Sequence, residues 1–183
     1  MKNTLISISL AALLATGPAT AEVTDAAAGG FTIVNDVVIR AARMDTWHAA
    51  INDIDQWWNP AHTVSGEGHR LSIDARPQGC FCENLGDTNG IVHLTVTMVS
   101  PGILLRLTGG LGPLGLLGVA GNMTWEFADT EDATRVTFTY AVGGYRAGGL
   151  EEFAGPVDQV IGEALQRLQA YIETGDAERV GSD

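Results

Sequence analysis

The chain has 183 residues, of which 45% are hydrophobic and 17% charged, and its formal net charge is −12. This length supports one ordinary domain with its own core, and the hydrophobic content argues against intrinsic disorder. The acidic charge argues against a nucleic-acid partner, since a phosphate-binding surface needs clustered basic residues. Two cysteines are too few for a disulfide-built miniprotein or a four-thiolate zinc module.

The first 21 residues have the pattern of a secretory signal peptide. One cation, Lys2, precedes an apolar run over residues 5–15, and Ala19-Thr20-Ala21 supplies small residues before a cleavage site. The run is shorter than the ~20 residues that a bilayer span requires. We therefore expect cleavage after Ala21, a periplasmic or secreted protein, and no membrane span in the mature chain. An uncleaved membrane anchor is the alternative.

The mature chain opens with residues 22–30, whose alanines and glycines predict a flexible tail. The β-branched residues of 31–40 predict a strand, and Asp45 is the predicted N-cap of a short helix that ends before Trp57. Further strands are predicted over 71–75, 80–85, 91–99 and 103–107, with Asn89-Gly90 forming a hairpin turn.

The last two predicted strands, 122–128 and 135–142, are amphipathic: aromatic and aliphatic residues alternate with polar ones along both. One face therefore packs and the other is wet, which is typical of an antiparallel sheet. A long helix follows, with Pro156 in its first turn, an apolar stripe of period 3.6 and an end at Gly175. We expect one domain over 31–175 and a polar tail over 176–183.

This order predicts an α+β fold, in which an open, curved antiparallel sheet covers its apolar face with the C-terminal helix. A sheet curled around one helix cannot close tightly along its whole length. A cleft between the sheet and the helix is therefore expected.

The order of elements resembles the helix-grip fold of the START/Bet v 1-like superfamily. The resemblance is to its SRPBCC group, which includes polyketide cyclase/dehydrase-like proteins and chaperone-activator relatives. It covers roughly residues 31–172 and rests on 31–40, WWNPAHTVSG (57–66), QGCFCE (78–83), LTGGLGPL (107–114) and TYAVGGY (139–145). The group usually has paired glycines before the third strand, where this chain has Gln78-Gly79. It implies a shared cavity and no particular chemistry or cofactor.

The cavity is expected between the sheet and the long helix, lined by aromatic and aliphatic side chains with a few polar ones. Trp57, Trp58 and His62 lie where the short helices should meet the sheet rim, and two indoles with an imidazole could line a ligand mouth. Alternatively, one tryptophan seals the helices against the core and His62 caps a turn. The full predicted lining is Trp57, Trp58, His62, Glu83, Leu94, Trp125, Phe138, Tyr140, Tyr145, Val160 and Leu168.

Cys80 and Cys82 lie two apart in a predicted strand and should share one face. A regular hairpin places Cys82 opposite His93 and Phe81 opposite Leu94, so that the cysteines and His93 lie together. Three interpretations remain open, namely a disulfide or redox pair, a metal site, and two thiols with no role. Alternate residues of an extended strand are about 6.6 Å apart, near the upper limit for a disulfide. We expect neither a metal nor a cofactor.

The same register turns Glu83 toward the apolar face of the sheet. A carboxylate among apolar side chains is expected to have a raised pKa, which suits general acid–base catalysis. A pairing with Arg106 on a neighbouring strand would instead make Glu83 structural. Glu83 and His62 are the candidate catalytic residues.

The segment 109–118 combines glycines with leucines, and the sequence does not show where these leucines would be buried. It is interpreted as a lid over the cavity, as a patch that contacts a partner, or as a loop folded onto its own core. No lysine followed by serine or threonine comes after its glycines, so it is not a nucleotide-binding loop. The predicted lid residues are Leu111, Pro113, Leu114, Leu116 and Leu117.

The first functional hypothesis is a periplasmic protein that binds a small hydrophobic molecule, of lipid, isoprenoid or polyketide type. The first alternative is a cyclase- or dehydratase-like enzyme with Glu83 or His62 as acid or base. The second is a protein-interaction module. No protein partner can be named from the sequence.

Overall fold

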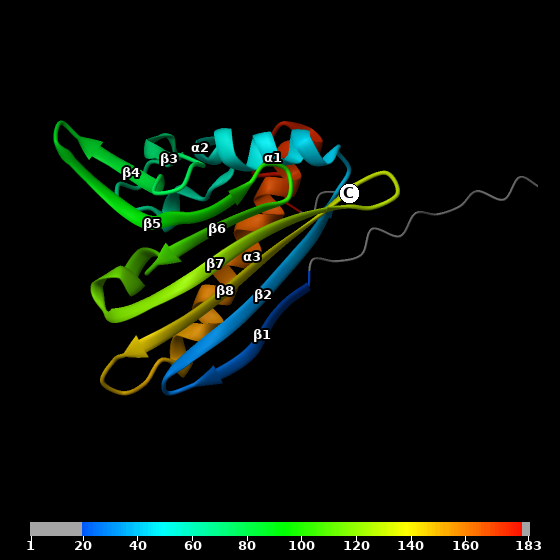
Figure 1. Cartoon of the computed structure of the whole chain (residues 1–183). Coiled ribbons are helices and arrows are strands. Elements are labelled where there is room, and N and C mark those ends of the chain that lie inside the picture. Colours follow the sequence, from blue (N-terminus) through cyan, green and yellow to red (C-terminus); the bar gives the residue numbers. More distant parts are fainter. Residues whose placement is uncertain (1–19, 181–183) are drawn as a thin grey trace, which may run out of the picture.

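The computed structural model describes residues 20–180 and consists of an eight-stranded antiparallel sheet with one long helix across its inner face (Figure 1). The strands lie in the order β1-β2-β8-β7-β6-β5-β4-β3. They are β1 (Thr20–Ala27), β2 (Gly30–Ile39), β3 (Leu71–Ile73), β4 (Cys80–Gly86), β5 (Asn89–Ser100), β6 (Leu104–Gly109), β7 (Gly118–Asp129) and β8 (Thr134–Tyr145). The helices are α1 (Arg43–Asn52), α2 (Ile54–Trp57) and α3 (Glu151–Thr174), with 3-10 turns η1 (Pro60–His62), η2 (Gly68–Arg70) and η3 (Gly112–Leu116).

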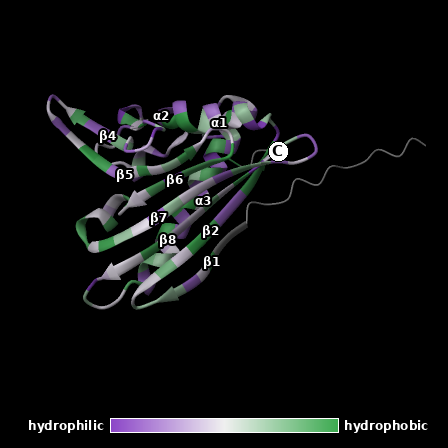
Figure 2. Ribbon diagram, in the orientation of Figure 1, coloured by the Kyte–Doolittle hydropathy of each residue, from purple (hydrophilic) through white to green (hydrophobic). Residues whose placement is uncertain are grey.

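The predicted alternation of buried and exposed residues is confirmed along the central strands. Every second residue of β2 is buried, and hydrophobic and hydrophilic residues alternate along the sheet (Figure 2). Trp125 of β7 pairs with Phe138 of β8, and their rings stack with centroids 4.2 Å apart. Both side chains are completely buried, so this pair forms the middle of the core.

Helix α3 presents its apolar stripe to the sheet, and Ile161, Leu165 and Leu168 are fully buried there. The predicted end is confirmed, because Gly175 takes the left-handed conformation (φ 78°) that stops a helix. The predicted start was wrong. The helix begins at Glu151, after the buried Leu150, and Pro156 lies inside it. A proline has no N–H, so the carbonyl group of Glu152 receives no helical hydrogen bond from it.

The expected flexible tail over residues 22–30 is also corrected by the structure. Strand β1 pairs in antiparallel fashion with β2, with Val23 opposite Ile33 and Ala27 opposite Gly30. Alanine and glycine have weak strand propensity, and the exposed edge of β2 overrides it by supplying backbone partners. Residues 1–19, which carry most of the predicted signal peptide, lie outside the described residues.

Gln78 has a positive φ of 70°, a conformation that normally favours glycine. It is the position at which the resembled group usually carries a glycine. Its N–H donates to the carbonyl oxygen of Val96 at 2.9 Å, and this bond holds the turn before β4 against β5. Gln78 therefore holds a backbone conformation that a glycine would adopt with less strain.

Candidate functional site

A cavity of about 920 Å³ opens at one end of the molecule, between the N-terminal half of α3 and the β4–β5 hairpin. The turn η1 and the segment around η3 close its other sides. Its lining is mostly apolar and includes Trp58, Val64, Leu71, Phe81, Ile91, Val92, Leu111, Pro113, Leu116, Phe153, Pro156, Val157, Val160 and Ile161. The polar side chains among the lining residues are His62, Thr63, His93 and Glu152.

The cavity lies further toward the β4–β5 end of the molecule than the sequence predicted. Of the predicted lining residues, only Trp58, His62 and Val160 contribute to it directly. Large side chains fill the middle of the space between sheet and helix, and Tyr145 is 77% exposed at the end of β8. The predicted residues that belong to the buried core and are not among the lining residues are Trp57, Glu83, Leu94, Trp125, Phe138, Tyr140 and Leu168.

Trp58 and His62 flank the rim in the way the sequence suggested, whereas Trp57 seals α2 against the core. The Trp57 ring contacts Trp125, and its indole N–H donates to the carbonyl oxygen of Ala49 at 3.3 Å. The Nε2 atom of His62 lies 3.1 Å from a carboxylate oxygen of Glu163 on α3. His62 therefore links η1 to the long helix at the cavity mouth.

Only part of the glycine–leucine segment lines the cavity. Leu111, Pro113 and Leu116 line the cavity, and Leu116 is 89% exposed. In contrast, Leu114 is buried in the core, and Leu117 packs against the core in a half-buried position.

Tyr140 of β8 anchors this segment from beneath. Its hydroxyl donates to the carbonyl oxygen of Gly109 at 2.9 Å and accepts from the N–H of Leu111 at 3.0 Å. Burial raises the pKa of this phenol, and the N–H of Leu111 partly offsets the rise. The segment is thus fixed at its first residues and exposed at Leu116.

Glu83 is the most strongly hydrogen-bonded carboxylate in the region. Its side chain is fully shielded from solvent and accepts from the N–H groups of Val64 (3.0 Å) and Ser65 (2.6 Å). The Nε2 atom of His93 lies 3.0 Å from its Oε2 atom. Burial acts to raise the pKa of Glu83, but the bonds from Ser65, Val64 and His93 outweigh it and lower that pKa from 4.5 to about 2.

The expected raised pKa of Glu83 was therefore wrong, and so was the alternative pairing with Arg106. The burial of the Glu83 carboxylate was predicted correctly. However, the loop 63–66 supplies two backbone N–H groups that bind this carboxylate, and the pattern of a strand does not reveal them. The Nε atom of Arg106 lies 3.4 Å from the hydroxyl of Thr124 on β7. Glu83 is ionised at neutral pH, and it fixes the loop whose Val64 lines the cavity.

A shift of register in the β4–β5 hairpin explains the position of His93. Phe81 pairs with Leu94, as predicted, but Cys82 pairs with Val92 and not with His93. The shift between Phe81 and Cys82 adds one residue to β5, and an added residue moves side chains to the opposite face. His93 is consequently buried beside Glu83, while Val92 is 61% exposed.

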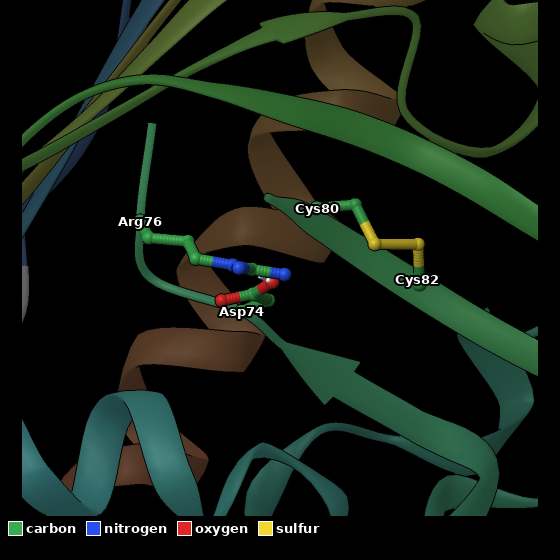
Figure 3. The surroundings of a disulfide bond; sticks show 4 residues. All are labelled: Asp74, Arg76, Cys80 and Cys82. Atoms are coloured by element: carbon green, nitrogen blue, oxygen red, sulfur yellow. Dashed lines mark hydrogen bonds and ion pairs between the residues drawn. A yellow bond between two sulfur atoms is a disulfide. The ribbon is translucent and has the colours of Figure 1, made fainter. Parts of the chain in front are cut away.

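The two cysteines form a disulfide within β4, one of the three interpretations left open above. The Cα atoms of Cys80 and Cys82 are 5.4 Å apart, closer than in a regular extended strand. Figure 3 shows the bridge along β4, with the ion pair of Asp74 and Arg76 nearby. The bridge spans Phe81, which lines the cavity.

The chain matches no protein-family model and no curated protein sequence. Solved structures resemble it nevertheless. A conserved protein of unknown function from Enterococcus faecalis, EF2215, superimposes with a TM-score of 0.61 at 14% identity, covering 90% of this chain and 82% of its own. The Aha1 dimer from Colwellia psychrerythraea gives 0.55 at 16% identity, covering 79% of this chain and 97% of its own. DynU16, from the dynemicin biosynthetic locus, superimposes with a TM-score of 0.54 at 19% identity. The match covers 80% of this chain and 48% of DynU16.

This chain has the helix-grip fold. The antiparallel sheet wrapped around α3 and these structural neighbours agree on that point, which confirms the fold class expected from the sequence. The fold is that of Bet v 1-like proteins.

The helix-grip domain holds no metal-binding cluster of three or more His, Cys, Asp or Glu side chains within residues 20–180. None of the helices in that same range has the length and apolar character needed to cross a bilayer. The site of this helix-grip protein is an apolar cavity lined in part by His93, whose imidazole contacts the buried carboxylate of Glu83.

His93, Glu152 and Phe153 line the cavity but were not predicted to do so, and Glu163 was not predicted as the partner of His62. Glu152 and Phe153 were missed because the helix was expected to begin at Pro156. A signal for His93 was present, since it is the only histidine in the predicted strands, but its face depended on the hairpin register.

Proposed function

We propose that this chain is a carrier that binds one small hydrophobic molecule in the cavity beneath α3. The observation that carries the proposal is a cavity of about 920 Å³ with a mostly apolar lining. Ligand sites in proteins are typically clefts of about 300–1,000 Å³ with a few polar groups that set orientation. Affinity would come mainly from burial of apolar surface, at about 25 cal/mol per Å².

Membership of the SRPBCC group, and of its polyketide cyclase/dehydrase-like branch, is part of this proposal. It is supported by the structural likeness to DynU16, a protein from the dynemicin biosynthetic locus. At 19% identity that likeness concerns the fold, and the nature of the ligand follows from the cavity chemistry alone. Binding is favoured over catalysis by Glu83 because this carboxylate has no proton to donate at neutral pH. With its pKa lowered to about 2 and its oxygens bonded to Val64, Ser65 and His93, it is also a weak base.

We also propose that the protein acts in the periplasm or is secreted, after cleavage following Ala21. Two observations support this location. The first is the signal-like sequence of residues 1–21, and the second is the Cys80–Cys82 disulfide, since disulfides persist in oxidising compartments. Expression with residues 1–21 and mass analysis of the secreted or periplasmic product test it. A product that begins at Glu22 is expected, and an intact product contradicts it.

The binding function is tested with the uncharged fluorescent probe N-phenyl-1-naphthylamine. The wild-type protein is expected to bind it with enhanced fluorescence. Val160→Trp places an indole in the cavity and should weaken binding at least tenfold, because it occupies the space that the probe needs. Gln159→Trp, on the exposed face of the same helix, is the matched control and should bind like wild type.

Two outcomes contradict the binding proposal. One is that folded wild-type protein does not bind the probe. The other is that wild type and Val160→Trp bind the probe equally well. Circular dichroism establishes that each variant is folded before the comparison is made.

A further inference from the structure

We propose that His93 is the polar recognition residue of the cavity, and that it selects apolar ligands bearing a hydroxyl group by accepting a hydrogen bond through Nδ1. This inference rests on the proposed binding function and adds the chemical class of the ligand. It follows from the hydrogen bonds of the His93 ring, from the place of that ring in the cavity lining and from the hydrogen bonds that hold Glu83.

One ring nitrogen of His93 already has a partner. Nε2 of His93 lies 3.0 Å from Oε2 of Glu83, and the side chains of the two residues are 6% and 0% exposed. An ionised carboxylate can only accept hydrogen bonds, so the proton of this bond belongs to the imidazole. Nε2 is therefore the donor.

Glu83 is held in place by the backbone. Its other bonds come from the backbone N–H groups of Val64 and Ser65, which cannot rotate away as a side chain could. The carboxylate is held on the η1 side of β4, and it holds the imidazole in turn. A partner that engages one ring nitrogen sets the tautomer and the direction of the other.

The other ring nitrogen of His93, Nδ1, has no partner of this kind in the part of the chain that the structure describes. In the neutral ring with a proton on Nε2, Nδ1 carries a lone pair and accepts hydrogen bonds. Among residues 20–180 no polar atom forms a hydrogen bond with it. The ring lines the cavity beside Phe81, with the two ring centroids 5.4 Å apart. Nδ1 is thus the acceptor that remains for a bound molecule.

The surroundings define the ligand. The lining residues on β4 and β5 next to His93 are Phe81, Ile91 and Val92, and α3 contributes apolar side chains that include Val157 and Val160. Such a site favours an apolar body, and the Nδ1 atom of His93 offers an acceptor for a hydroxyl group on that body. The other cavity imidazole, His62, already pairs with Glu163 at the mouth. A buried acceptor left unpaired disfavours a ligand that lacks the hydroxyl.

The test uses two compounds of the same shape, 4-pentylphenol and 1-methyl-4-pentylbenzene, in which a methyl group replaces the hydroxyl. Each displaces N-phenyl-1-naphthylamine from the full chain at pH 8. The phenol is expected to bind about three- to tenfold more tightly than the methyl compound, the gain of one buried hydrogen bond.

His93→Phe keeps a ring at this position and removes the acceptor, so the preference for the phenol should vanish. His48→Phe is the matched control, because His48 is exposed on α1 and is not among the residues that line the cavity. The control should retain the wild-type preference. Equal affinity of wild type for the two compounds, or a preference that survives in folded His93→Phe, overturns the inference.

A second measurement needs no variant and decides the matter if His93→Phe does not fold. In protein labelled with ¹⁵N at histidine, the Nδ1 resonance of His93 should shift upfield when 4-pentylphenol is added and stay in place with the methyl compound. A resonance unmoved by bound phenol overturns the inference while leaving the carrier function intact. Failure of every compound and of the fluorescent probe to bind removes both.

Discussion

The imidazole of His93 and the carboxylate of Glu83 meet at 3.0 Å, although they lie on different strands and are not paired residues of the β4–β5 ladder. Glu83 pairs with Ile91, and the added residue in β5 turns His93 onto the same side. The contact joins β4, β5 and the loop 63–66, since Glu83 also accepts hydrogen bonds from the N–H groups of Val64 and Ser65. The stability of the site therefore depends on one buried carboxylate.

Replacement of that carboxylate should cost stability in a pH-dependent way. Folding lowers the pKa of Glu83 from 4.5 to about 2, so its ionised form stabilises the fold above pH 4.5, and this contribution is lost as the pH falls toward 2. Glu83→Gln should lower the free energy of unfolding at pH 7 by on the order of 3 kcal/mol. Urea denaturation at pH 7, 5 and 3 should show this penalty shrinking with falling pH.

Glu126→Gln is the control for that series, because Glu126 is exposed on β7. Its effect should stay within about 0.5 kcal/mol at every pH. A Glu83→Gln penalty that is equal at pH 7 and pH 3 would contradict the proposed ionised state of Glu83.

Removal of the disulfide should have a modest effect. The bridge joins residues with a sequence separation of 2, so it restricts the unfolded chain little, and the loop-entropy relation gives about 1–2 kcal/mol. Calorimetry of Cys80→Ser/Cys82→Ser should show a Tm lower by about 3–6 °C. Dithiothreitol should bring wild type to the Tm of the variant and leave the variant unchanged. A wild-type Tm that does not respond to reduction contradicts this expectation.

Gln78→Gly is expected to stabilise the protein. The residue has φ 70°, where a Cβ atom is strained, and glycine should relieve about 0.5–1 kcal/mol. The gain should appear as a Tm higher by about 1–4 °C. Gln159→Gly, in the interior of α3, serves as the opposite case and should cost about 1 kcal/mol. A loss of stability in Gln78→Gly would show that the turn depends on the glutamine side chain.

Tyr140→Phe should loosen the glycine–leucine segment. It removes the hydroxyl that binds the carbonyl group of Gly109 and the N–H of Leu111, and such unpaired groups cost about 1–3 kcal/mol. Hydrogen exchange across residues 110–117 should become faster. Tyr171→Phe is the matched control, because its hydroxyl binds Asp53 and should leave that exchange unchanged. Unaltered exchange in Tyr140→Phe would mean that the segment is held by its leucines alone.

Local patterns sufficed for the elements whose side chains alternate with a clear period. Strands β7 and β8 and most of α3 were predicted because one face of each meets the core along its whole length. Strand β1 was missed because its alanines do not alternate with polar residues. The strand forms by pairing with the edge of β2. Helix α3 was predicted too short because Pro156 was placed in its first turn, whereas the buried Leu150 and Ala154 extend it.

The candidate site was harder to predict than the fold. Its position depends on how Trp125, Phe138 and Tyr140 fill the centre of the sheet–helix interface, which displaces the open space toward β4 and β5. The ionisation of Glu83 depends on two backbone donors from residues 64 and 65, far from it along the chain. Neither property is encoded in a short window of sequence.

The amino-acid sequence alone determined the class of fold, because periodic burial of side chains is a local property that a reader of the chain can count. Only the tertiary structure decided where the cavity lies and which polar atom it offers. A single added residue in β5 reverses the face of His93, and no local pattern distinguishes that register from the regular one.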